Sequence, residues 1–167
     1  MIQIGDPSAT LDTPIEHLLA CHRRIEQRLD TLVKAADHFL IDRAGAMAAV
    51  QKSFQFLESS GARHTEDEEG SLFPRLRPHL SAAELEFVES LEAEHREADR
   101  VYSELKALAE EVSEATLPSY RECAESLRAL YRKHIRAEDE ILTAIARRCL
   151  TDEQLTEVSG EMRARRG

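Results

Sequence analysis

Apolar residues recur along this sequence in rows with helical spacing, which we call apolar seams. Six side chains of types that commonly bind metal ions interrupt these seams. On two of these seams a glutamate also lies four residues after the histidine, so each of these pairs shares one face of a helix. An unpaired polar group in a protein core costs about 1–3 kcal/mol, and a buried carboxylate costs more. The six residues are His22, His64, Glu68, His95, His134 and Glu138.

Metal ions would compensate for this cost more fully than hydrogen bonds between the imidazoles and the carboxylates would. Imidazole nitrogens and carboxylate oxygens suit iron, manganese or zinc. Two carboxylates at the centre of a four-helix site can bridge two cations. The residue types therefore predict a site for a pair of metal ions, and the alternative is a metal-free layer of imidazole–carboxylate hydrogen bonds.

The elements that must position these residues are helices. Apolar residues recur at alternating steps of three and four, which is typical of helices that face a bundle core. Capping-box sequences begin at Thr13, Ser81, Ser119 and Thr151, and all five prolines fall where the periodicity lapses. We expect an all-α fold: an up-down-up-down four-helix bundle with a short extra C-terminal helix, in a single domain over residues 1–167. The predicted bundle covers residues 14–148, with helices at 14–41, 43–72, 82–113, 119–148 and, outside the bundle, 152–164.

The spacing of the four histidines places them at one height in such a bundle. In an antiparallel pair of helices, two residues share a height when the turn lies midway between them. The midpoint of His22 and His64 is residue 43, that of His64 and His95 lies between 79 and 80, and that of His95 and His134 lies between 114 and 115. All three midpoints fall on predicted turns, and a helix rises about 1.5 Å per residue. The six side chains are therefore expected to form one layer.

The fourth helix gives the longest seam, and a basic run ends the fifth helix. The seam passes through Tyr131, His134, Glu138, Ile141 and Ile145, which predicts that all five face the core. The run from residue 163 to 166 reads Arg-Ala-Arg-Arg, and we interpret it as a solvated end that complements the helix dipole.

Composition excludes several classes of function. The 167 residues include 32 acidic and 22 basic side chains, a formal charge of −10 that repels nucleic acids and anionic lipids. The longest apolar run, residues 46–50, is far shorter than the roughly 20 residues of a membrane helix, and no secretory signal pattern opens the chain. Cys21, Cys123 and Cys149 are too few and too scattered for a disulfide framework. A cytoplasmic protein without nucleic-acid or membrane partners is expected, and its protein partner is unknown.

The quoted residues resemble the hemerythrin family, also called the HHE cation-binding domain. The most specific part is the H-x-x-x-E-E-x-x-L-F-P stretch from His64 to Pro74, accompanied by His22, Glu94-His95 and the segment from His134 to Glu138. The resemblance covers about residues 12–146. It implies two non-haem iron ions (Fe2+ or Fe3+) in a four-helix bundle, bridged by the two glutamates and, as a further candidate bridge, an oxygen atom. The histidines would be terminal ligands.

One departure from the family pattern concerns the third helix. Oxygen-carrying hemerythrins have a second histidine four residues after the one in this helix, and Asp99 stands there in this chain. Asp99, and Glu26 four residues after His22, lie about 40° from the direction of their histidines. Each is a candidate metal ligand, a hydrogen-bond partner of an imidazole, or a solvated charge. By position, His17, His38 and His79 do not reach the layer.

Members of the family bind dioxygen, sense oxygen or redox state, or handle iron and nitric oxide damage. The resemblance therefore implies a protein that binds a small oxidant, namely dioxygen, nitric oxide or peroxide, for sensing, storage or iron handling. One alternative is a di-iron enzyme that turns over peroxide or oxidises a substrate. Another is a zinc-bound or metal-free bundle that serves as an interaction domain. Ferritin-type sites need Glu-x-x-His on two helices, and only the segment from Glu92 to His95 fits that pattern.

Overall fold

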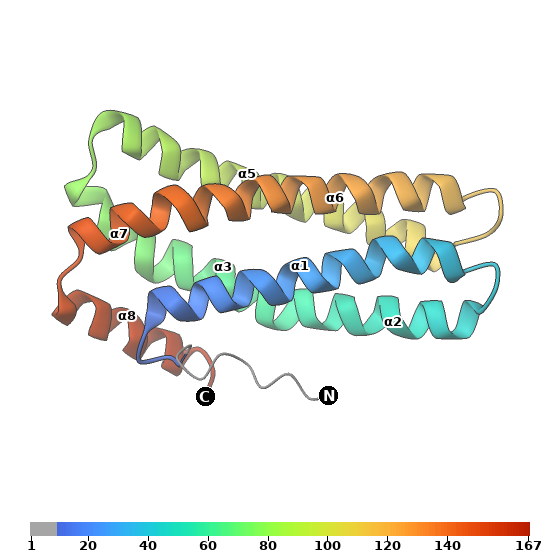
Figure 1. Ribbon diagram of the computed structural model, residues 1–167, viewed down its shortest axis with the longest axis horizontal. Helices are drawn as coiled ribbons and strands as arrows, with labels where there is room; N and C mark the ends of the chain where they lie inside the picture. The colour runs from blue at the N-terminus through green and yellow to red at the C-terminus, as the bar shows by residue number, and fades with distance from the viewer. Residues whose placement is uncertain (1–9) are drawn as a thin grey trace.

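A computed structural model describes residues 10–167, and every regular element in that range is helical. Figure 1 shows long helical rods that reverse direction at each turn, with α8 lying across one end of the bundle. The predicted all-α bundle with an extra C-terminal helix is confirmed. The residues before 10, which include the start of the predicted single domain, lie outside the described range. The elements are α1 (Pro14–His38), α2 (Arg43–Phe56), η1 (Leu57–Gly61), α3 (Ala62–Asp67), η2 (Glu68–Leu72), α4 (Phe73–Leu76), η3 (Arg77–His79), α5 (Ala82–Glu110), α6 (Leu117–Ala137), η4 (Glu138–Leu142), α7 (Thr143–Cys149) and α8 (Asp152–Ala164).

Two of the four predicted capping boxes are formed. Ser81 and Thr151 make both reciprocal hydrogen bonds of a capping box at the starts of α5 and α8. The predicted box at Thr13 is wrong, because its hydroxyl donates to the carbonyl of Thr10 at 3.2 Å and makes no cap bond. The box at Ser119 is also wrong, since α6 begins at residue 117 and already contains this serine.

The second long helical segment of the bundle, which runs from α2 to η3 and is called the second rod, continues beyond its predicted end through a π-helical turn. The helix was expected to stop at residue 72 because Pro74 lacks the amide hydrogen that a helix interior needs. The π turn η2 ends at Leu72, and Pro74 lies in the first turn of α4, where a proline without an amide hydrogen is tolerated. Helical turns therefore continue through α4 and η3 to His79.

A second π turn, η4, changes the predicted seam of the fourth rod. Ile141 was expected in the core, but 47% of its surface is exposed, whereas Leu142 is 3% exposed. The π turn places one extra residue in the helix, which rotates the following side chains relative to an α-helical pattern. The predicted burial is therefore wrong for Ile141 and is confirmed for Ile145.

The apolar core is divided into two clusters, one on each side of the six polar residues. One cluster fills the bundle around Leu29, Leu105 and Tyr120, whose hydroxyl donates to the carbonyl of Leu32 at 2.9 Å. The other joins α1, α4, α5 and α7 to Val158 and Met162 of α8. None of the helices in residues 10–167 combines the length and apolar character that crossing a bilayer requires.

The two neighbouring side chains of η4 give a test of this register. Replacing Leu142 with Ala should lower the free energy of unfolding by about 2–5 kcal/mol, because it leaves a cavity in a packed core. Replacing Ile141 with Ala should change it by no more than about 0.5 kcal/mol. Urea unfolding of the metal-free variants measures both values. Equal losses, or a larger loss for Ile141→Ala, would contradict the π register.

Candidate metal centre

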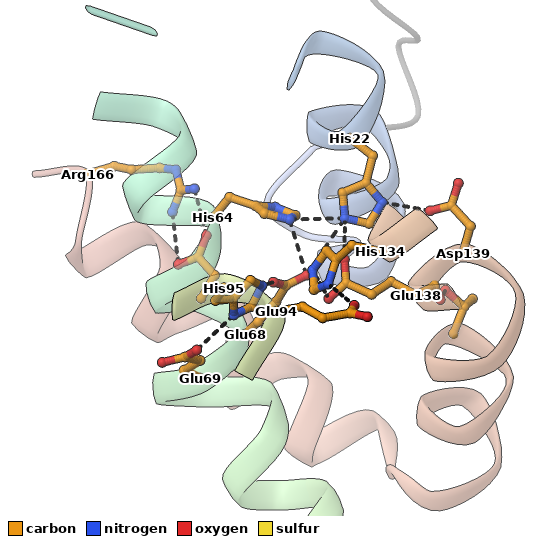
Figure 2. A network of polar contacts seen from close by, with 12 residues as sticks. His22, His64, Glu68, Glu69, Glu94, His95, His134, Glu138, Asp139 and Arg166 are labelled. Carbon is orange, nitrogen blue, oxygen red and sulfur yellow. Dashed lines mark hydrogen bonds and ion pairs between the residues drawn. The ribbon is translucent and has the colours of Figure 1, made fainter. Parts of the chain in front are cut away.

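The structure brings all six predicted residues into one layer, each from a different element. Figure 2 shows the four imidazoles and two carboxylates pointing toward one another. They form two groups of four, and within each group the candidate ligand atoms all lie within 4.8 Å of one another. Both groups contain Glu68 and Glu138. The two groups are His22, His64, Glu68 and Glu138, and Glu68, His95, His134 and Glu138.

Each shared carboxylate presents one oxygen atom to each pair of histidines. Glu68 Oε1 lies 3.2 Å from His64 Nε2, and Oε2 lies 3.4 Å from His95 Nε2. Glu138 Oε2 lies 3.1 Å from His22 Nε2, and Oε1 lies 3.1 Å from His134 Nε2. This two-sided arrangement is the one that a carboxylate bridging two cations requires.

The polar atoms of the layer fit metal ions better than they fit one another. Both oxygens of Glu68 and both oxygens of Glu138 are buried, and within the described chain none accepts a well-oriented hydrogen bond. The Nε2 atoms of His22 and His64 point toward each other at 3.0 Å. Buried carboxylates without oriented donors are costly, whereas cations placed among these atoms would satisfy oxygens and nitrogens together. The ligand role of the six residues stays a prediction.

Three carboxylates outside the layer hold the far side of three imidazoles (Figure 2). The Nδ1 atom of His22 donates to Asp139 at 2.6 Å, that of His95 to Glu69 at 2.7 Å, and that of His134 to Glu94 at 3.0 Å. Because a carboxylate only accepts hydrogen bonds, each contact places the hydrogen on Nδ1 and turns Nε2 toward the layer.

Sequence reasoning missed these three partners, although each is the chain neighbour of a predicted ligand. Glu69 and Asp139 directly follow Glu68 and Glu138, and the four residues begin the π turns η2 and η4. Each π turn thus aims one carboxylate at the layer and the next one at an imidazole from another rod. The paired acidic residues in the E-E and E-D sequences were the available signal.

His64 has a different surrounding from the other three histidines. Its Nδ1 atom has no carboxylate partner within residues 10–167, and the Cys21 thiol contacts its ring. Its position is fixed instead by the helical turn that it shares with Glu68, four residues further along.

The charges in the layer shift the pKa of each of its histidines upward. Burial opposes protonation, but the contacts of His22 with Asp139, Glu138 and Glu68 outweigh it and raise its pKa to about 12. Burial also opposes protonation of His64 and His95, but Glu68 outweighs it at both residues. The pKa of His64 therefore rises to about 10 and that of His95 to about 9.

The pKa of His134 is also raised, because Glu138 outweighs burial. Burial opposes ionisation of Glu68, yet the histidines hold its pKa well below the ordinary value. Without cations, the carboxylates of the layer therefore favour protonation of its imidazoles, and metal ions must displace these protons.

The remaining candidates lie apart from the donor atoms. Glu26 and Asp99 belong to neither group, and Asp99 is exposed. Glu26 is half-buried and lines a surface hollow beside Asp139. His17, His38 and His79 also lie outside both groups.

The two tyrosines near the site differ in their contacts. The hydroxyl of Tyr102 donates to Glu58 at 3.0 Å, away from the layer. The ring of Tyr131 meets the ring of His134 edge-on, with 6.5 Å between ring centroids. Tyr131 was expected to face the core, and both tyrosines are half-buried.

A small cavity adjoins one side of the layer. His22, Glu68 and Glu138 form its polar wall, and Leu18, Leu72 and neighbouring apolar residues form the rest. It has room for roughly one water-sized molecule. A small neutral molecule could therefore approach the shared carboxylates from an apolar surrounding.

Comparisons with known proteins agree with this geometry. A protein of Haemophilus influenzae described as uncharacterized is 28% identical over 172 residues, which cover 99% of this chain and 98% of that protein. Residues 13–146 match the family described as the hemerythrin HHE cation binding domain. That range contains all six residues of the layer and their three outer carboxylates. The chain belongs to the hemerythrin family of HHE cation-binding domains.

Proposed function

We propose that this protein binds two non-haem iron ions between Glu68 and Glu138 and uses them to bind a small oxidant, namely dioxygen, nitric oxide or peroxide. The observation that carries the proposal is the sharing of both carboxylates by two donor groups. The physiological role would be sensing, storage or iron handling in the cytoplasm.

The number of donors decides which bound cation would keep a position for a small molecule. Each group offers two imidazole nitrogens and one oxygen from each shared carboxylate, which makes four donors for each cation. Four donors complete the tetrahedral shell that zinc prefers in structural sites. Iron in nitrogen and carboxylate sites keeps open positions beyond its protein ligands. The donor set therefore leaves iron, but not zinc, with positions for a small molecule.

The residues around the layer hold and tune the ligands. Asp139, Glu69 and Glu94 orient their imidazoles and make the facing nitrogens better donors. Leu18 and Leu72 belong to an apolar wall that limits the access of water to Glu68 and Glu138. When bound, the iron pair would supply electrons to the oxidant.

The size of the cavity favours binding over the conversion of a larger substrate. Its water-sized volume excludes a larger organic substrate, and its lining contains no acid or base besides His22 and the two glutamates. Turnover of peroxide is the enzymatic alternative. Steady consumption of peroxide by the iron-loaded protein would support that alternative over a binding function.

The number of bound ions in single variants tests the sharing of carboxylates. Wild-type protein loaded anaerobically with Fe2+ should bind two ions per chain. Glu68→Gln should lower this toward zero, because both donor groups contain Glu68, whereas His95→Ala should leave about one ion, because only one group contains His95. Elemental analysis after gel filtration gives the count.

Asp99→Asn is the matched control and should keep two ions, since its side chain lies outside both groups. An equal, partial loss for Glu68→Gln and His95→Ala would contradict the bridging role. One ion or none in the wild-type protein would contradict the iron pair itself.

The stability of the metal-free protein should fall as the pH rises from 6.5 to 10. Folding raises the pKa of His95 from 6.5 to about 9 and that of His64 to about 10. A raised pKa stabilises the folded state fully below pH 6.5, and this contribution is lost as the pH passes through the folded value. Each pKa unit corresponds to about 1.4 kcal/mol. Urea unfolding at pH 6.5, 8 and 10 measures the change.

Two comparisons assign this pH dependence to the layer. His95→Gln should reduce the decrease, and His79→Gln should keep it, because His79 is exposed in η3. Metal-loaded protein should show little decrease, since its ligand nitrogens carry no proton. Stability of the metal-free protein that stays constant or rises between pH 6.5 and 10 would overturn the assignment.

A further inference from the structure

A fully buried carboxylate lies directly beside the candidate ligands without belonging to them. Asp67 precedes Glu68 in the chain and follows His64 by three residues, and none of its surface is exposed. It is absent from both donor groups. A buried carboxylate requires partners of opposite charge, and for Asp67 these come from the other end of the chain.

Two arginines directly after α8 bind Asp67 and the π turn that follows it. Arg166 Nη2 donates to Asp67 Oδ2 at 2.7 Å, and Arg165 Nη1 donates to Oδ1 at 2.9 Å. Arg166 Nη1 also lies 3.3 Å from Oδ1. Arg165 Nη2 donates to the hydroxyl of Ser71, which is fully buried in η2, at 2.7 Å. The two guanidinium groups thus bind residues that precede and follow Glu68 in the chain.

Gly70 makes room for this contact. A Cβ atom at this position would lie 2.9 Å from Arg165 Nη2, closer than side chains normally approach. The glycine in the middle of the π turn therefore allows the guanidinium group to lie against the backbone between Asp67 and Ser71.

The sequence interpretation of the basic C-terminal run is corrected by these contacts. Arg165 and Arg166 were expected to be solvated, but they pair with a buried carboxylate, and Arg163 pairs with Asp12. The pairing of Asp67 with two arginines was invisible in the sequence, since nearly a hundred residues separate the partners.

α8 itself is anchored on the same part of the bundle. Val158 and Met162 have no exposed surface and belong to the cluster that contains Leu72. Arg75 pairs with Glu157 and Glu161 of α8 at 3.1 and 2.8 Å. α8 and its arginines follow residue 146, where the family match ends.

We propose that Arg165, Arg166, Asp67 and Ser71 form a C-terminal latch that positions Glu68 and thereby retains the metal ions. Hydrogen bonds between charged groups at 2.7–2.9 Å restrain the π turn. Both donor groups depend on Glu68, so loosening this turn weakens both cation sites together. The latch rests on the metal-binding part of the proposed function and requires neither iron nor an oxidant.

The rate of metal release tests the latch in the full-length chain. Zn2+-loaded protein is mixed with an excess of chelator, and the release rate is measured at pH 7. Arg165→Gln/Arg166→Gln should release zinc about 10-fold faster, the lower end of the loss of metal affinity that follows removal of groups supporting metal ligands. The double Lys variant should fall between this variant and the wild type, because it keeps the charges and loses the paired guanidinium geometry.

Two further variants separate positioning from stability. Glu157→Gln removes an ion pair between α8 and Arg75 but leaves the latch and the hydrogen bond from Arg75 to the Ser71 carbonyl intact, so its release rate should change less than about twofold even if its melting temperature falls. Asp67→Asn in the Gln double variant removes the unpaired buried charge while the latch stays broken. This triple variant should fold and still release zinc rapidly.

Hydrogen exchange of the metal-free variants gives a readout that needs no metal. Amides of residues 64–72 should exchange faster in the Gln double and triple variants, whereas amides of residues 99–109 in α5 should be unchanged. Failure of the chain to take up zinc would contradict the proposed metal binding. The exchange rates of residues 64–72 would still test whether the arginines restrain the π turn.

Wild-type release rates in the double variant would overturn the proposal. So would a triple variant restored to the wild-type rate, since neutralising Asp67 would then be the only role of the arginines. Equal acceleration by Glu157→Gln would show that docking of α8, and not the latch, retains the metal.

Discussion

The burial of two carboxylates among four imidazoles is the constraint on which the rest of the structure depends. Both oxygens of Glu68 and of Glu138 are withdrawn from water and, within the described chain, lack well-oriented hydrogen-bond donors. Such a layer is stable only when positive charge lies inside it, as protons on the imidazoles or as cations between them. The two apolar clusters fix the height of the layer, and the outer carboxylates fix the orientation of its rings.

The two π turns are the backbone feature that places the buried carboxylates in the layer. Glu68 and Glu138 each begin such a turn, so each carboxylate enters the layer while the next residue reaches an imidazole on another rod. A π turn is uncommon in helices and is frequent at functional sites. In the second rod the turn also carries the contact with Arg165, which ties the centre to the C-terminal end of the chain.

Periodicity and spacing predicted the helices and the single height of His22, His64, His95 and His134, because both follow from regular helical geometry. Two of the errors share one physical origin, since a π turn has no propensity signal and its extra residue rotates the side chains beside it. This accounts for the exposed Ile141 and for the helix that continues past Pro74. The partners of Asp67 depend on a long-range approach that no local pattern encodes. The ligand roles of the six residues are still to be measured.

Anomalous diffraction from iron-loaded crystals tests the central claim most directly. Data collected on both sides of the iron absorption edge should reveal two peaks per chain. One should lie between His22 and His64 and the other between His95 and His134, with Glu68 and Glu138 contacting both. A single peak, peaks outside this layer, or a layer whose carboxylates contact only imidazoles after iron loading would contradict the account.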